Sequence, residues 1–340
     1  MSNQNTKRNV GIVILVIIIL GAIIGGYGYY ASAGTGTGNA STTQSTLVTT
    51  ANPASSNEAV SILGAGATFP APLIQKWTIE YNKLYPWVTI NYNPIGSGGG
   101  IQQITQKTVD FGASDAPLSD AQLQNATGLT LMPETLGGVA ITYDLQPYGI
   151  ANTTVINFTG DVLAQIYMGK ISQWNDPAIA ALNPNLQLPK AAITAVHRSD
   201  GSGTTYAFTD YLSAVNPDWK MAVGRSTSVT WPVDKTGTGI GAKGNAGVAG
   251  TVANTPGSIG YVDVIYASGK SLGIGAVKNA AGNFVSPNLQ TIANAAASAT
   301  GTLDPKDLRL HIVNAAGDQS YPIATYTYIL LYKEMSTNLV

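Results

Sequence analysis

The stretch Ile193-Thr-Ala-Val-His-Arg-Ser-Asp-Gly-Ser-Gly-Thr-Thr-Tyr-Ala-Phe-Thr-Asp-Tyr-Leu212 contains the pattern on which this chain is built. It begins with an apolar run typical of a buried strand and continues through a loop rich in glycine and hydroxyl side chains. From Tyr206 to Leu212 the spacing of the large apolar residues predicts a helix. A strand, a loop of small residues and a helix in this order are typical of α/β proteins, which bind ligands at the carboxyl ends of strands.

Two further loops have the same character. Gly64-Ala-Gly-Ala-Thr-Phe-Pro70 follows an apolar run at 60–63, and Gly96-Ser-Gly-Gly-Gly100 follows another at 88–92. Each loop leads into a predicted helix, so unpaired N–H groups and small hydroxyls are expected at the positive end of a helix dipole. Proteins hold oxyanions in this way, and three such loops in one chain predict an anion site.

Strands and helices are predicted to alternate along the rest of the folded part, which begins near Val60. The segment 258–267 is predicted as a strand followed by a short helix. The other predicted strands are 60–63, 88–92, 109–113, 138–143, 193–196 and 323–331, and the predicted helices are 73–81, 101–107, 161–167 and 206–212. This alternation predicts an α/β fold rich in parallel strand pairs.

The composition excludes several classes of function. Only 10% of the 340 residues are charged, and 17 Lys and Arg nearly balance 18 Asp and Glu, which argues against a nucleic-acid partner. The chain has no cysteine, so disulfide scaffolds and cysteine nucleophiles are excluded. Two histidines, His197 and His311, leave little material for a metal site. We therefore expect neither a metal nor another cofactor.

Residues 1–32 predict an N-terminal membrane anchor or a signal peptide. Lys7 and Arg8 precede an apolar run at 10–24, and about 20 apolar residues span a bilayer. The length of the run favours an uncleaved anchor, whereas Ala31-Ser-Ala33 resembles the cleavage site of a signal peptide, which is the alternative. Either one places the rest of the chain outside the cytoplasm, at the cell surface or in the periplasm.

Residues 33–58 consist mainly of Ser, Thr, Gly, Ala and Asn, a composition that predicts a flexible linker. Four triplets along the chain match the acceptor pattern for N-glycosylation, which agrees with an external location and predicts a glycoprotein. They begin at Asn39, Asn125, Asn152 and Asn157.

The three loops contain the donors that a tetrahedral oxyanion needs. Hydroxyl groups come from Thr68, Ser97, Ser202 and Thr204, and glycines leave the backbone N–H groups accessible. Arg198 offers a bidentate fork, and Asp200 is expected to hold it in place. The alternative is that these two residues form an ordinary surface ion pair. His197 is expected to point to the other side of its strand.

Asp115, at the end of the strand 109–113, is expected to decide which anion binds. A carboxylate close to an anion is unfavourable unless the anion brings a proton. Phosphate carries a P–OH group at neutral pH and sulfate carries no proton, so Asp115 would accept from phosphate and reject sulfate. The alternative role for Asp115 is the N-cap of the turn that follows it.

The chain closely resembles the phosphate-binding proteins of ABC phosphate importers. The resemblance covers roughly residues 60–333 and is carried, in the family's order, by five segments: Gly64-Ala-Gly-Ala-Thr-Phe-Pro-Ala-Pro72, Ile95-Gly-Ser-Gly-Gly-Gly100, Val109-Asp-Phe-Gly-Ala-Ser-Asp-Ala-Pro-Leu-Ser-Asp120, Ile166-Tyr-Met-Gly-Lys-Ile-Ser-Gln-Trp-Asn-Asp176 and Arg198-Ser-Asp-Gly-Ser-Gly-Thr204. Lys243-Gly-Asn-Ala-Gly247 and Gly257-Ser-Ile-Gly-Tyr-Val262 also look like family segments.

The resemblance implies a two-domain venus-flytrap fold that closes over one dehydrated phosphate. It implies a first domain at 60–143 plus 321–340 and a second at 144–320, joined by two crossover strands that act as a hinge. The phosphate-binding residues it implies are Thr68, Phe69, Ser97, Asp115, Arg198, Ser202, Gly203 and Thr204, with Asp200 orienting the arginine. The implied partners are inorganic phosphate and a membrane permease with a cytoplasmic ATPase, and the implied receptor is a monomer without enzymatic activity.

One departure from the family concerns the C-terminus. In the family, two or more helices follow the strand that matches 321–331, whereas this chain stops at Val340. We therefore expect either a fragment or a first domain that completes its core differently.

Three other functions have weaker support in the sequence. Gly239-Ile-Gly-Ala-Lys-Gly244 lacks the spacing and the hydroxyl of a P-loop, and no arrangement for a phosphatase is evident, which argues against an enzyme. A structural adhesin would not need three anion loops. A receptor for another oxyanion is the nearest alternative, and arsenate has the same proton and a similar shape.

Overall fold

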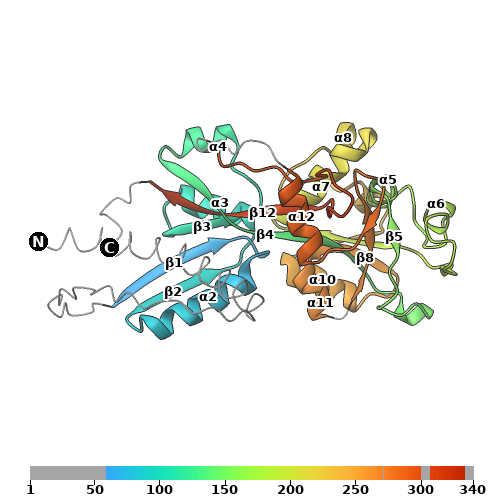
Figure 1. Cartoon of the computed structure of the whole chain (residues 1–340), viewed down its shortest axis with the longest axis horizontal. Coiled ribbons are helices and arrows are strands. Elements are labelled where there is room, and N and C mark those ends of the chain that lie inside the picture. The colour runs from blue at the N-terminus through green and yellow to red at the C-terminus, as the bar shows by residue number, and fades with distance from the viewer. Residues whose placement is uncertain (1–58, 271, 300–306, 334–340) are drawn as a thin grey trace, which may run out of the picture. The chain divides into compact units, whose positions relative to one another are not determined.

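The computed structural model describes residues 59–270, 272–299 and 307–333 (Figure 1). They form two compact units, of which one holds residues 59–62 and 75–91 and the other holds the described residues of Leu63–Ile74 and Tyr92–Lys333. The predicted anchor and linker, at 1–58, lie outside the described residues. In the part that is described, no helix is long and apolar enough to cross a membrane. The domain boundaries predicted from the sequence are a different division of the chain and stay a prediction.

The second unit is built on a mixed sheet with the strand order β1-β3-β12-β4-β8-β6-β7, and β9 lies beside β4. A smaller sheet has the order β11-β10-β5. The strands are β1 Val60–Gly66, β2 Val88–Asn93, β3 Phe111–Ser114, β4 Leu129–Tyr143, β5 Asn157–Phe158, β6 Thr194–Arg198, β7 Gly239–Ala242, β8 Ser258–Asp263, β9 Gly273–Ile274, β10 Ala276–Lys278, β11 Phe284–Val285 and β12 Ala324–Tyr332.

The predicted preference for parallel pairs is correct around the loop-bearing strands and for the short pair of β5 and β10. β1 and β3 are parallel, as are β6 and its two neighbours β7 and β8. The long strand β12 is antiparallel to both β3 and β4, and β4 is antiparallel to β8. These two long strands lie side by side through the middle of the sheet and make it mixed (Figure 1).

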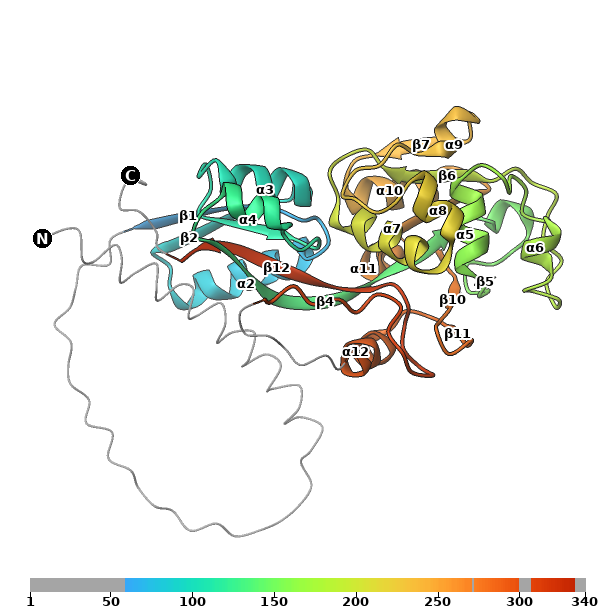
Figure 2. The same ribbon diagram turned by 90° about the horizontal axis from the view of Figure 1, so that it is seen from above.

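The helices agree with the prediction in place more closely than in length. They are α2 Ala71–Leu84, α3 Ser97–Thr105, α4 Asp120–Asn125, α5 Gly160–Tyr167, α6 Pro177–Ala180, α7 Gly203–Val215, α8 Pro217–Ala222, α9 Pro232–Lys235, α10 Gly244–Ala253, α11 Val264–Gly269 and α12 Leu289–Ser298, with a short 3-10 helix at Gln146–Tyr148. Figure 2 shows α5, α7 and α8 together, and α7 contacts both of the others.

The start of α3 differs from the prediction. The helix was expected from residue 101, yet it begins at Ser97, inside the glycine loop. A Cβ added at Gly100 would lie 2.5 Å from the Cα of Gly66, so the absence of side chains lets this helix pack directly on the end of β1. Helix propensity disfavours glycine, and close backbone packing outweighs it here.

Strand β4 contributes to two apolar cores. Leu129 and Leu131 pack in a cluster with Ile104, Tyr328 and other residues of α3 and β12. The later part of β4, with Val139, Ile141 and Tyr143, packs in a larger cluster that contains Trp174, Phe208 and Tyr261. Each fully buried side chain of this size stabilises the fold by about 1.5–3 kcal/mol. Because β4 contributes side chains to both clusters, the two cores share one strand.

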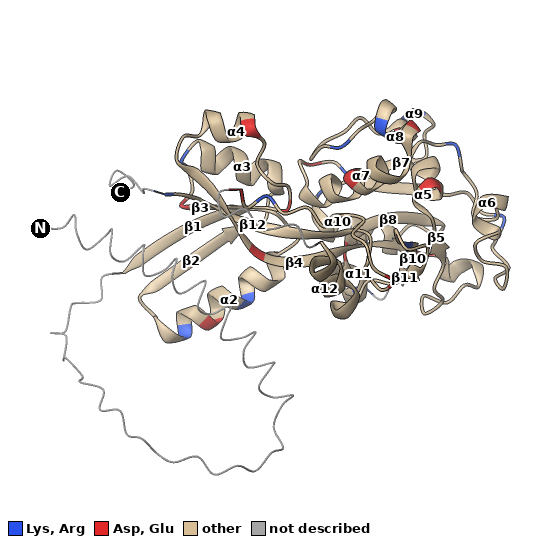
Figure 3. Ribbon diagram, turned by 45° about the horizontal axis from the view of Figure 1, so that its top comes forward, with Lys and Arg blue, Asp and Glu red and all other residues tan. Residues whose placement is uncertain are grey.

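Charged residues are sparse on the described ribbon. Lys and Arg, drawn blue, and Asp and Glu, drawn red, occur at scattered positions over it (Figure 3). Most of the polar surface is therefore provided by neutral groups, as the composition indicates.

Candidate functional site

The three predicted anion loops meet in the second unit. The Ser97 Oγ accepts hydrogen bonds from the backbone N of Gly203, at 3.0 Å, and of Asp115, at 3.2 Å. The backbone N of Gly98 donates to the carbonyl oxygen of Gly201 at 2.9 Å. The backbone N of Gly96 donates to the carbonyl oxygen of Gly66 at 2.8 Å, which joins the loop after β1 to the loop after β2. The three loops and the turn after β3 are therefore in direct contact, although more than one hundred positions separate Ser97 from Gly203.

Two helices begin at the contact between Ser97 and Gly203. Ser97 is the first residue of α3, which follows Gly96 with a φ of 92°, a conformation that suits glycine. Gly203 is the first residue of α7, and the Ser202 Oγ caps this helix by accepting from the backbone N of Thr205 at 3.0 Å. The positive ends of two helix dipoles thus lie beside the same buried groups.

The four predicted hydroxyl groups all accept hydrogen bonds within the described residues. Three of them accept twice. The Thr68 Oγ1 accepts from the backbone N and the Nδ2 of Asn245, the Thr204 Oγ1 from Arg198 and Asn245, and the Ser97 Oγ from two backbone N atoms, while Ser202 accepts once. A hydroxyl has one proton and two lone pairs, so Thr68, Ser202 and Thr204 still have a proton to donate, whereas the Ser97 hydroxyl also hydrogen-bonds the Asp115 carboxylate.

The guanidinium of Arg198 is buried, with 4% of the residue exposed. Its Nε donates to the Asp200 Oδ1 at 2.7 Å and its Nη2 to the Oδ2 at 2.5 Å, while Nη1 lies 3.3 Å from the Thr204 Oγ1. Burial alone would raise the pKa of Asp200, but the hydrogen bonds and charge of Arg198 outweigh it and lower the pKa. The alternative of an exposed surface pair is wrong, because this fork is fixed in the interior.

Asp115 lies at the end of β3 and is 1% exposed. Its Oδ1 accepts from the hydroxyl of Thr327 at 2.8 Å. Burial raises the pKa of Asp115 to about 7. The hydrogen bond from Thr327, the charge of Arg198 and the hydrogen bond from Ser97 lower this pKa, but by less than burial raises it. The alternative role as N-cap of the following turn has no support among the described residues, because the Asp115 carboxylate binds Thr327, the backbone N of Ala116 donates to Ser114, and Ser119 caps α4.

Gly203 lies against Asp115 without room for a side chain. A Cβ added at Gly203 would lie 2.6 Å from the Oδ2 of Asp115 and 2.6 Å from the Oγ of Ser97. Phe69 is also buried, and its ring covers Gly137 of β4, where an added Cβ would lie 2.4 Å from the Phe69 Cε1. The structure thus brings all the predicted site residues into one unit, with close packing at the glycines.

Two residues of the hydrogen-bond network around the site are not predicted from the sequence alone. Asn245, at the start of α10, is fully buried and donates to both Thr68 and Thr204, while its Oδ1 accepts from the backbone N of Asp263. Thr327 donates to Asp115 from the apolar strand β12. The family-like segment Lys243-Gly-Asn-Ala-Gly247 was a signal for Asn245, whereas nothing in the local sequence distinguishes Thr327.

His197 takes no part in this network. Its Nε2 lies 2.8 Å from the Asp234 Oδ1, and its ring stacks on Trp231 with centroids 4.9 Å apart. Arg198, the next residue, binds Asp200 instead, so the two side chains serve different neighbours as expected. Among the described residues, no group of histidines and acids could hold a metal ion.

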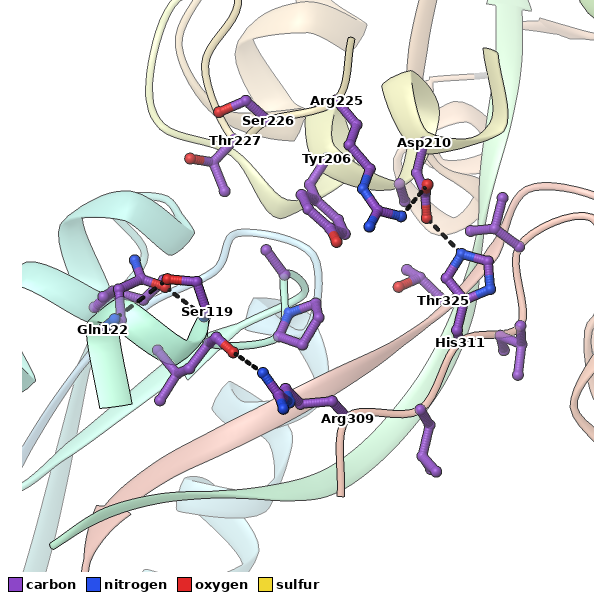
Figure 4. Close-up of a pocket in the computed structure, with 18 of the residues that line it drawn as sticks. Ser119, Gln122, Tyr206, Asp210, Arg225, Ser226, Thr227, Arg309, His311 and Thr325 are labelled. Carbon is purple, nitrogen blue, oxygen red and sulfur yellow. Dashed lines mark hydrogen bonds and ion pairs between the residues drawn. The ribbon is translucent and has the colours of Figure 1, made fainter. Parts of the chain in front are cut away.

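A cavity of about 550 Å³ adjoins the Asp115 loop. Ala116, Pro117 and Thr325 line it, as do Tyr206 and Asp210 of α7. Figure 4 shows Asp210 between two partners, with the Nη1 of Arg225 and the Nε2 of His311 each 2.7 Å from a carboxylate oxygen. The cavity therefore has a hydrogen-bonded cluster around Asp210 on its wall, distinct from the buried residues around Arg198.

Comparison with known proteins gives consistent matches. A family model described as "PBP superfamily domain" matches residues 39–338. The phosphate-binding protein PstS of Xylella fastidiosa is 45% identical over 286 residues, which cover 84% of this chain and 76% of that protein. The PstS protein of Pasteurella multocida is 44% identical over 276 residues, covering 81% of this chain and 77% of that protein.

A solved structure supports the fold. The crystal structure of a phosphate binding protein from Stenotrophomonas maltophilia matches with a TM-score of 0.58 and 22% sequence identity, and the match covers 81% of this chain and 79% of that one. At this identity the likeness concerns the fold alone. The fold is the mixed α/β, two-domain fold of periplasmic binding proteins.

Proposed function

This chain belongs to the PstS family of phosphate-binding proteins, within the PBP superfamily, and we propose that it is the phosphate receptor of an ABC importer. Proteins of this family are named for binding, and the proposed role is capture of inorganic phosphate without chemical conversion.

The observation that best supports this function is the state of the hydroxyl groups. Thr68 and Thr204 each accept two hydrogen bonds from N–H donors, which occupies their lone pairs and leaves their protons. Donors without competing acceptors suit an anion, and the Arg198 fork and two helix N-termini add positive potential. We assign phosphate binding to Thr68, Phe69, Ser97, Asp115, Arg198, Ser202, Gly203 and Thr204.

Asp115 gives the site its selectivity in this proposal. Its Oδ1 is engaged by Thr327, and the Oδ2 faces the first residue of α7, as the short distance from an added Gly203 Cβ indicates. An ionised Asp115 accepts the P–OH proton of phosphate and leaves sulfate with two acceptors facing each other. Arsenate carries the same proton, so this acceptor does not discriminate against it.

Closure would occur about β4 and β12. β4 pairs with β12 from Leu129 to Gly138 and with β8 from Val139 to Tyr143. We propose that these strands are the hinge between a domain at 60–143 plus 321–340 and a domain at 144–320. Closing would bring the donors of Arg198 and α7 onto a phosphate that already touches Ser97 and Asp115.

The predicted N-terminal segment would keep the receptor at the membrane. We propose that residues 1–32 anchor an extracytoplasmic monomer and that the linker at 33–58 lets it search near its permease, which raises the effective concentration. The permease would couple to a cytoplasmic ATPase. We also propose that the four acceptor triplets are glycosylated.

The test is calorimetric titration of the full chain, kept in detergent, with phosphate and then with sulfate at neutral pH. We expect one phosphate to bind tightly and sulfate to give no heat. Equal binding of both anions would favour a general oxyanion receptor. No heat from either anion, in a sample that melts cooperatively, would overturn the proposed function.

A further inference from the structure

Glu134 is a partly buried residue with a buried carboxyl group that the proposed binding mechanism does not use. It is the only Asp or Glu in the long strand β4. Both of its carboxyl oxygens are shielded from solvent and have no hydrogen-bond partner among the described residues. An ionised carboxylate without a partner in the interior is strongly disfavoured, so a proton on this group is the stable state.

The backbone places Glu134 next to the pairing position of Thr327, the residue that donates a hydrogen bond to Asp115. In the β4–β12 ladder, Thr327 pairs with Thr135 and Tyr328 pairs with Pro133, so Glu134 is the extra residue of a β-bulge. Bulges re-aim side chains and are frequent next to functional sites. The residue opposite this bulge, Thr327, is the one whose hydroxyl binds the Asp115 carboxylate.

The two carboxyl groups influence each other. Burial, and then the charge of Asp115, raise the pKa of Glu134 to about 8. Burial raises the pKa of Asp115 only to about 7, because Thr327, Arg198 and Ser97 favour its ionised form. The geometry favours the same order, because the Asp115 carboxylate accepts from Thr327 while both Glu134 oxygens lack a partner among the described residues, so the negative charge belongs on Asp115 and the proton on Glu134.

The other titratable groups around the site have partners. Tyr92 and Tyr266 donate their hydroxyl protons to the carbonyl oxygens of Ala67 and Thr68. Asp263, whose pKa burial raises to about 7, accepts from the backbone N of Ile265 at the start of α11. Among the three acids Asp115, Glu134 and Asp263, Glu134 alone lacks a hydrogen bond in the described chain.

We propose that Glu134 is a specificity-determining residue of the phosphate site, because it holds a proton while Asp115 carries the negative charge. This inference rests on the proposed function. With the charge on Asp115, the site contains an acceptor and requires a protonated oxyanion. With the charge on Glu134 instead, Asp115 would be a donor and the site would admit an anion without a proton.

The proposal predicts proton uptake on binding in alkaline solution. A bound phosphate adds negative charge near Glu134, so ligand and proton bind cooperatively to the protein. Above the pKa of Glu134, the phosphate affinity of the unmodified chain should fall by up to about tenfold for each pH unit. In Glu134→Gln, which keeps the shape of the protonated acid, this extra fall should be absent while affinity at pH 7 changes less than about threefold.

The experiment is calorimetric phosphate titration of the full chain and of Glu134→Gln between pH 6.5 and 9, in buffers of different ionisation enthalpy, which counts the protons exchanged. We expect net uptake near pH 8.5 in the unmodified chain and its loss in Glu134→Gln. Asp263→Asn, which can still cap α11, is the matched control and should keep the uptake. Phosphate's own titration affects all three proteins equally.

Three results would overturn the inference. They are identical pH profiles and proton counts in the unmodified chain and Glu134→Gln, loss of the uptake in Asp263→Asn instead, and absence of uptake in the unmodified chain. The last needs no variant and decides the matter even if Glu134→Gln fails to fold. Absence of phosphate binding at pH 7 would instead overturn the proposed function, and the inference with it.

Discussion

The Oγ of Ser97 lies 3.0 Å from the backbone N of Gly203, and this hydrogen bond joins the first residue of α3 to the first residue of α7. The same oxygen accepts from the backbone N of Asp115, so one hydroxyl joins its own loop to two others. The hydroxyl also hydrogen-bonds the Asp115 carboxylate, and in the proposed function its proton turns to the bound phosphate. The contact is therefore both structural and, in the proposed function, part of the phosphate site.

Ser97→Ala should weaken phosphate binding by about 10- to 100-fold, since a hydrogen bond to a charged group contributes about 1.5–3 kcal/mol. Calorimetry at neutral pH measures the change. Ser119→Ala is the control, because it removes the cap of α4 and should cost about 1 kcal/mol of stability without changing affinity. Equal affinity of Ser97→Ala and the unmodified chain would remove Ser97 from the site.

Gly203→Ala should weaken phosphate binding at least about 100-fold. The added methyl group would lie 2.5 Å from the Cβ of Asp115, so the Asp115 loop or α7 must move. A misplacement of about 1 Å is sufficient for an effect of this size on an organised site. Titration with phosphate and a thermal melt would measure it.

Gly250→Ala is the matched control for that variant. Gly250 lies inside α10, and an added Cβ there meets no atom within 4 Å. This change should leave binding intact and stabilise the helix by about 0.5–1 kcal/mol. If both glycine variants bind phosphate like the unmodified chain, close packing at Gly203 has no role in binding.

Arg198→Lys should lower phosphate affinity by at least about 100-fold, although the charge is kept. Lysine cannot reproduce the fork in which Nε and Nη2 bind both oxygens of Asp200 while Nη1 points to Thr204. Arg309→Lys, at a partly exposed pair with Asp120, is the control and should bind normally. A small effect at Arg198 would mean that point charge alone accounts for its role.

Asp210→Asn should reduce stability at neutral pH by about 1–3 kcal/mol. Burial would raise the pKa of Asp210, but the hydrogen bonds and charges of His311 and Arg225 outweigh it and lower the pKa below its ordinary 3.8. A carboxyl whose pKa is lowered by folding stabilises the protein above its unfolded pKa and loses this effect as pH falls through the folded pKa. Denaturant titrations should therefore show that the free energy of unfolding differs between the unmodified chain and Asp210→Asn at pH 7 and that this difference becomes smaller in acid. A difference that stays constant with pH would contradict the role given to Asp210.

The local sequence was sufficient to predict the loops of the site. Glycine, serine and threonine at the end of an apolar run define a turn into a helix, and this depends on neighbouring residues only. Thr68, Ser97, Asp115 and Arg198 were therefore predicted as candidates, and the structure brings them into one unit. Their roles in phosphate binding stay a proposal.

What the sequence could not predict depends on contacts between distant segments. Thr327 lies 212 positions from Asp115, and Asn245 lies 177 positions from Thr68, so no local pattern links them. Glu134 lies outside the predicted strand 138–143, and its place depends on a bulge in the pairing of β4 with β12. The antiparallel course of β12 was missed for the same reason, because strand direction is set by the whole chain.

The most direct test of the central claim is the ratio of the dissociation constants for phosphate and sulfate in the unmodified chain and in Asp115→Asn. The account predicts a large preference for phosphate that falls by at least about 100-fold in the variant, because an amide can donate to sulfate where the carboxylate repels it. An unchanged ratio, in a variant that folds and still binds phosphate, would contradict the assignment of Asp115 as the acceptor that selects phosphate.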